Sequence, residues 1–146
     1  MRKGDALGYE EIAQRGMRAV AGLPEDLVYA GFSLGTGPAE FLAATRPGAR
    51  GVVLMHGALP IEAFDLDRWP AETPVQVHYV AEDPWVEVPE VTSLGDAVRR
   101  AGVRFEAHTY PGSGHLFADP DLPEHDPSSS DLMWRRVLEF LARTDD

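Results

Sequence analysis

Short apolar runs alternate along this chain with longer segments in which apolar residues recur at helical spacing. The short runs are five to eight residues long and predict buried strands; they cover Leu27–Phe32, Gly51–Met55, Val75–Val80 and Val103–Tyr110. The last run alternates apolar with polar residues, which is typical of an edge strand. The helical spacing predicts four helices, at about Tyr9–Ala21, Pro38–Thr45, Val91–Ala101 and Ser130–Ala142. Ser128–Asp131 is the expected cap of the last helix.

Strands that are apolar throughout and joined mostly through helices predict a parallel sheet covered on both faces. We therefore expect an α/β fold, a three-layer sandwich with a mainly parallel sheet of about four strands. No internal repeat or linker divides the sequence, so residues 1–146 are expected to form a single domain. In such sheets the ligand site lies at the carboxyl ends of the strands, and the residues that follow each strand are the candidates for chemistry.

Composition narrows the possible partners and locations. The 146 residues carry 13 Lys and Arg against 24 Asp and Glu, a net charge of −11, which disfavours nucleic acid and anionic membrane surfaces as partners. Cysteine is absent, which excludes disulfides, thiolate metal sites and a cysteine nucleophile. No apolar stretch is long enough for a membrane span, and the polar amino-terminal residues do not resemble a signal peptide, so we expect a cytoplasmic protein. No histidine spacing indicates a metal site.

Gly31-Phe32-Ser33-Leu34-Gly35 matches the G-x-S-x-G pattern between a predicted strand and a predicted helix. In that context the pattern indicates a nucleophile elbow, a sharp turn that presents the serine hydroxyl. We expect both glycines to be required because a side chain at either position would collide with the reversing backbone. The alternative is an ordinary turn serine between two glycines.

A serine nucleophile needs a base, and the base needs an acid that fixes its tautomer. In this sheet order the partners should follow as acid and then histidine, each after a later strand. Asp83 follows Val75–Val80, and His115 follows Val103–Tyr110. Glu82 competes with Asp83 for the acid role.

Four further residues are candidates for the substrate site because they flank these three in the sequence or end a strand: Phe32, His56, Trp85 and Phe117. His56 either lines the pocket or caps its strand, and the two later aromatic residues either wall the site or belong to the core. The remaining histidines, His78, His108 and His125, are expected to be ordinary surface or sheet-face residues.

Three segments together resemble the dienelactone hydrolase family of α/β-hydrolases: Tyr29–Gly35, Asp83–Trp85 and Tyr110–Asp119. The resemblance runs through nearly the whole chain from about Tyr9. It implies Ser33 as nucleophile, His115 as general base and acid, and Asp83 as the orienting carboxylate, with no cofactor. The implied activity is hydrolysis of small carboxylic esters or lactones through an acyl-enzyme.

Three departures qualify this resemblance. The best-known members of the family carry cysteine where Ser33 stands, and an arginine for a substrate carboxylate where this chain reads Leu116–Asp119, which makes an anionic lactone a doubtful substrate. Here the elbow also follows a single helix, so the front half of the family sheet is missing. Only the backbone N–H of Leu34 is then expected as an oxyanion donor.

Two expectations follow from the missing half. The strand Leu27–Phe32 should be an exposed apolar edge, which favours a homo-oligomer paired along it unless the chain is a shortened product of a longer gene. An alternative function also stays open, in which the chain keeps the triad but serves as a binding domain with little or no activity.

Overall fold

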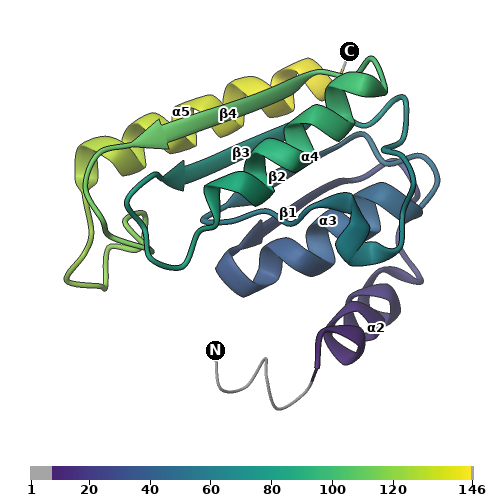
Figure 1. Ribbon diagram of the computed structural model, residues 1–146, viewed down its shortest axis with the longest axis horizontal. Coiled ribbons are helices and arrows are strands. Elements are labelled where there is room, and N and C mark those ends of the chain that lie inside the picture. Colours follow the sequence, from purple (N-terminus) through teal and green to yellow (C-terminus); the bar gives the residue numbers. More distant parts are fainter. Residues whose placement is uncertain (1–7, 146) are drawn as a thin grey trace.

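Four parallel strands form the centre of the computed structural model, which describes residues 8–145 (Figure 1). They lie side by side in chain order: β1 (Val28–Phe32), β2 (Gly51–Met55), β3 (Val75–Val80) and β4 (Phe105–Tyr110). The helices are α2 (Tyr9–Val20), α3 (Thr36–Thr45), α4 (Val88–Arg100) and α5 (Pro127–Thr144), with short 3-10 turns η1 (Ser33–Gly35) and η2 (Ile61–Phe64). The predicted α/β fold with a parallel sheet is confirmed.

Helices cover both faces of the sheet. α3 and α4 lie on one face and α5 lies on the other (Figure 1). Every residue of β2 and β3 is buried, as expected for central strands of a parallel sheet. Successive side chains of a strand point to opposite faces, so Val52 and Leu54 pack toward α3 and α4, whereas Val53 and Met55 pack toward α5.

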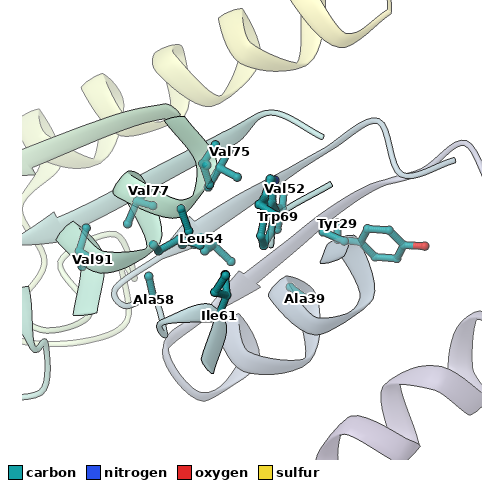
Figure 2. Packing of buried hydrophobic residues seen from close by; sticks show 14 of the residues in the cluster. Tyr29, Ala39, Val52, Leu54, Ala58, Ile61, Trp69, Val75, Val77 and Val91 are labelled. Carbon is teal, nitrogen blue, oxygen red and sulfur yellow. The ribbon is translucent and has the colours of Figure 1, made fainter. Parts of the chain in front are cut away.

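The core under α3 and α4 is the larger of the two (Figure 2). It combines side chains from β1, β2 and β3 with residues from the segment between β2 and β3, including Ile61 and Trp69. Trp69 is fully buried, and its indole N–H donates to the carbonyl of Thr73. The sequence predicted only a loop in this segment. Its many Pro and Asp residues are typical of a solvated loop and did not indicate that Ile61 and Trp69 are buried in the core.

β1 lies at one edge of the four-stranded sheet, as the sequence predicted. The exposed residues of this strand, Ala30 and Phe32, are apolar, whereas Tyr29 and Gly31 are buried. Tyr29 is covered because Arg46 donates to its hydroxyl and also to carbonyls at the end of α2. Self-association along β1 stays a prediction.

The termini of two helices differ from the predicted ones. α5 begins at Pro127, and its cap is Asp126, whose carboxylate accepts from the backbone N–H of Ser129; the expected cap cluster Ser128–Asp131 is therefore wrong. α4 begins at Val88, three residues before the predicted start, because Pro89 occupies its first turn, where a missing N–H is tolerated. Among the described residues, no helix is both long and apolar enough to cross a membrane.

One carboxylate is buried between α3 and the segment that follows β2. Glu40 is 0% exposed; its Oε2 accepts from the backbone N–H of Leu59, and its Oε1 has no hydrogen-bond partner. Burial raises the pKa of Glu40 from 4.5 to about 8, and the nearby charge of Glu90 acts in the same direction. The folded protein therefore holds a proton on Glu40 that the unfolded chain releases above about pH 4.5.

We expect Glu40→Gln to become more stable relative to the parent protein as pH rises from 4.5 to 8. Over this window the free energy of unfolding of the parent protein falls by up to about 1.4 kcal/mol per pH unit, because only the unfolded chain releases the Glu40 proton. The amide of the variant cannot ionise, so the variant lacks this loss. Urea unfolding of both proteins at a series of pH values measures the difference. The comparison with the parent is needed because other buried groups also change stability with pH. The pKa values of His56 and His78 are lowered, so both proteins lose stability as pH falls below 6.5.

Glu62→Gln is the matched control, since Glu62 is exposed and should follow the parent at every pH. Parallel stability curves for Glu40→Gln and the parent would contradict the assignment of a buried, proton-holding carboxyl.

Candidate active site

The elbow serine begins the turn that joins β1 to α3. Ser33 has φ 48°, in the left-handed region that a side chain rarely adopts, and the 3-10 turn η1 starts at this residue. The hydroxyl of Thr36 donates to the Ser33 carbonyl at 2.7 Å, which holds the turn closed. The sequence analysis missed this role of Thr36, although a hydroxyl residue three positions after a turn is a recognisable signal.

The two glycines of the motif are not equivalent. A Cβ on Gly31 would lie 2.1 Å from the carbonyl oxygen of Gly35, so the backbone comes too close for any side chain there. A Cβ on Gly35 would meet nothing within 4 Å, and Gly35 has ordinary helical angles, φ −71° and ψ −13°. The expectation that both glycines are required is therefore wrong for Gly35, because the backbone turns back over Gly31 alone.

Three side chains that are far apart in the sequence form one hydrogen-bonded chain at the carboxyl edge of the sheet. Ser33 Oγ lies 2.6 Å from His115 Nε2, and His115 Nδ1 lies 2.5 Å from Asp83 Oδ2. The side chain of Asp83 is fully buried and that of His115 is 16% exposed. The remaining oxygen of Asp83 accepts from the backbone N–H of Trp85, a contact typical of an Asp at a turn before proline. Glu82 is exposed and follows β3 without joining this chain.

Glu124 contacts the loop that carries His115 and stabilises it through a hydrogen bond. Its carboxylate accepts from the backbone N–H of Leu116, the residue after the histidine. Gly114 lies so close to Glu124 that an added Cβ would come within 3.0 Å of its carbonyl oxygen. This contact could not be predicted from the sequence, because Glu124 stands in an acidic loop in which every side chain was expected to be solvated.

The four flanking candidates occupy different places around the triad. Phe32 and Trp85 are exposed, at 43% and 57%, and the Trp85 ring centroid lies 6.3 Å from that of His115. His56 is buried, with its ring 5.9 Å from the His115 ring. Phe117 is also buried, in the core under α5, and contacts His56 edge to face at 5.0 Å. Leu34, the expected oxyanion donor, is 42% exposed, and its backbone N–H sits in the first turn after Ser33, where helical amides have no intrahelical partner.

Histidines elsewhere in the chain do not reach the triad. His78 is buried on the α5 face of the sheet between the Tyr110 hydroxyl and the Gln76 side chain, and its pKa is lowered to about 3, chiefly by burial. Among residues 8–145, no group of three or more His, Asp or Glu side chains could hold a metal ion.

Comparison with known proteins places this chain in a family. Residues 10–144 match the model of the dienelactone hydrolase family. This chain belongs to that family. The curated relatives it matches include the "Putative carboxymethylenebutenolidase" of Salmonella typhi, with 27% identity over 129 residues, and the protein of the same name from Salmonella typhimurium, also 27% identical. The match covers 80% of this chain and 46% of either relative, so the chain spans about half their length.

Solved structures agree on the fold of this family member. A dienelactone hydrolase-like promiscuous phosphotriesterase from metagenomic libraries superimposes with a TM-score of 0.73 at 23% identity, covering 97% of this chain and 64% of that one. An α/β hydrolase enzyme from a Medee basin deep-sea metagenome library gives 0.68 at 19% identity, over 93% of this chain and 64% of that one. The family assignment supports a hydrolase, and the α/β-hydrolase fold is shared.

We predict opposite outcomes for the two glycines of the elbow. Gly31→Ala should destabilise the protein by more than about 2 kcal/mol, because the added methyl forces the backbone at Gly35 to move. Gly35→Ala should leave stability unchanged or raise it by up to about 1 kcal/mol, since its angles suit alanine. Urea unfolding of the two variants beside the parent provides the measurement, and equal losses in both would contradict the asymmetry.

Proposed function

We propose that this chain is a serine hydrolase that cleaves small carboxylic esters or lactones through an acyl-enzyme on Ser33. The observation that carries the proposal is the hydrogen-bonded chain from Ser33 through His115 to Asp83. A serine hydroxyl is a weak nucleophile until a base accepts its proton, and the two short contacts supply the base and its orienting acid.

The reaction would proceed in two halves. As Ser33 Oγ attacks the ester carbonyl, its proton passes to His115 Nε2, and the imidazolium is stabilised by the Asp83 carboxylate on the opposite nitrogen. His115 then donates that proton to the departing alkoxide, which leaves the acyl group on Ser33. Water attacks this acyl-enzyme with His115 again as base, and the carboxylic acid and the free serine hydroxyl are restored. No cofactor is needed.

Charge on the carbonyl oxygen needs hydrogen-bond donors in the transition state. The backbone N–H of Leu34 is one proposed donor, at the start of the helical segment that follows Ser33. The family resemblance predicts a second from a loop ahead of the elbow strand, whereas the described residues before β1 contain only α2. Each missing donor typically lowers turnover by about a hundred- to a thousandfold, so we expect weak activity from this chain alone.

The surroundings of the triad favour neutral substrates. Its proposed walls are the aromatic side chains of Phe32 and Trp85, and the segment after the histidine, Leu116–Asp119, offers no cation to a substrate carboxylate. Short-chain neutral esters are therefore better supported than anionic lactones.

A second candidate function is a binding domain that retains the triad without useful turnover. It is favoured by the described residues before β1, which contain α2 and no strand that could carry a second oxyanion donor. Activity measurements separate the two functions.

The purified protein should react with a fluorophosphonate at Ser33 and hydrolyse p-nitrophenyl butyrate slowly, because His115 activates the hydroxyl. Ser33→Ala should abolish both, with circular dichroism confirming that the variant folds. Mass spectrometry of the labelled peptide identifies the residue.

Undiminished labelling of Ser33→Ala would contradict the nucleophile assignment. Labelling at Ser33 in a parent protein that turns over no ester would favour the binding domain.

Asp83→Asn is predicted to lower ester turnover by a factor on the order of 10⁴, because an amide stabilises the wrong tautomer of His115. Glu82→Gln is the matched control: this neighbouring carboxylate is exposed, and its loss should leave turnover within about twofold of the parent. Steady-state kinetics with p-nitrophenyl butyrate compares the three proteins. A near-normal rate in Asp83→Asn together with a large loss in Glu82→Gln would transfer the acid role to Glu82.

A further inference from the structure

The imidazole of His56 is buried beside the triad without any polar partner. The residue is 2% exposed, and neither Nδ1 nor Nε2 has a hydrogen bond within the protein. An unsatisfied buried donor or acceptor costs about 1 to 3 kcal/mol, so two in one ring require a reason. Packing alone does not supply one, because an apolar side chain would fill the same space without that cost.

The backbone at His56 is also unusual. Its φ is 69°, and it directly follows β2, just as Ser33 with φ 48° directly follows β1. Phe32 pairs with Met55 in the register of the two strands, so the two left-handed residues stand at neighbouring strand ends. Left-handed non-glycine residues concentrate at functional sites, where the strain aims a side chain.

Aromatic rings surround His56 on the sides that the structure describes. Phe117 packs edge to face behind it at 5.0 Å, and His115 lies at 5.9 Å toward the triad. Phe32 stacks over it at 5.7 Å and is itself 43% exposed. The partly exposed ring of Phe32 therefore separates the His56 imidazole from solvent, and the His115 ring separates it from the Ser33 hydroxyl. A substrate group that displaces the Phe32 ring would reach the imidazole beside His115.

We propose that His56 is a specificity-determining residue that hydrogen-bonds a hydroxyl group on the substrate, close to the scissile ester. This inference rests on the proposed hydrolase function and narrows its substrate class to hydroxyl-bearing esters.

The chemistry of the ring selects a hydroxyl over a carboxylate. A neutral imidazole offers one donor and one acceptor nitrogen on different sides of the ring, and a hydroxyl can pair with either of them because it both donates and accepts. Burial, followed by the positive charge of a protonated His115, lowers the pKa of His56 to about 4, so the ring stays neutral at physiological pH. A carboxylate would find no positive charge there and, as an acceptor only, could pair with the donor nitrogen alone.

The test compares substrates that differ by one hydroxyl. On the acyl side the pair is p-nitrophenyl 3-hydroxybutyrate and p-nitrophenyl butyrate; on the alcohol side it is 2-hydroxyethyl butyrate and ethyl butyrate. We expect the parent to favour the hydroxyl-bearing member of one pair by about tenfold in kcat/KM, and that pair shows which part of the ester faces His56. Mono-p-nitrophenyl succinate, which carries a carboxylate, should gain nothing over the butyrate.

Two variants separate hydrogen bonding from structure. His56→Leu removes both nitrogens and should reduce the preference to about onefold. His56→Asn tolerates the left-handed backbone and keeps a donor and an acceptor, so it should retain part of the preference. Because a folding defect lowers the rates of both substrates alike, the ratio remains informative. An unchanged ratio in His56→Leu, no preference in the parent, or a preference for the succinate would overturn the proposal.

A binding measurement decides the proposal even if the chain hydrolyses nothing. In Ser33→Ala labelled with ¹⁵N at histidine, methyl 3-hydroxybutyrate or 2-hydroxyethyl butyrate should shift the His56 ring resonances, whereas methyl butyrate should not. No shift from either hydroxyl ester would overturn the role of His56. Failure of the hydrolase function is seen separately, as a parent protein with neither Ser33 labelling nor ester turnover.

Discussion

All four strands run in the same direction, and this constraint brings the residues of the proposed triad to one edge of the sheet. A parallel sheet needs a crossover between successive strands, here through α3, through the long segment around Trp69 and through α4. Each strand therefore ends at the same edge of the sheet. Ser33 and His56 directly follow β1 and β2, and Asp83 and His115 lie in the loops that follow β3 and β4. The two buried cores on either face fix the strands, and the strands in turn fix the spacing of these side chains.

The turn from β1 to α3 determines the conformation of Ser33 through the packing of its own backbone. The close approach of the Gly35 carbonyl to Gly31 and the hydroxyl of Thr36 force the left-handed conformation of Ser33. This strain is tolerated because α3 packs against the sheet immediately afterwards, with Ala39, Leu42 and Ala43 buried. Ser33 is thus attached to a packed helix, whereas Phe32, Leu34 and Trp85, which lie around the proposed triad, are exposed.

Unsatisfied polar atoms gather around one short segment after β2. His56 has two unpartnered nitrogens and Glu40, which holds the N–H of Leu59, has one unpartnered oxygen. Most buried polar atoms in proteins are paired, so three unpartnered atoms in and against one short segment are exceptional. On the α5 face of the sheet, His78 and Gln76 are paired with each other and with Tyr110 and Glu106, and among the described residues of this face only Nε2 of His108 is buried without a partner.

The sequence by itself determined the four strands, their parallel order, the family resemblance and the three triad candidates. Those signals are local: apolar runs, a five-residue motif and the order of residues after strands. It favoured Asp83 but left Glu82 as a competitor, and it could not tell Gly31 from Gly35 or the cap Asp126 from the serines beside it. Each distinction depends on which atom approaches which in space. Only the tertiary structure decided that His56 is buried without partners and that Tyr29 is covered by Arg46, since burial is a property of packed neighbours that are distant in the chain.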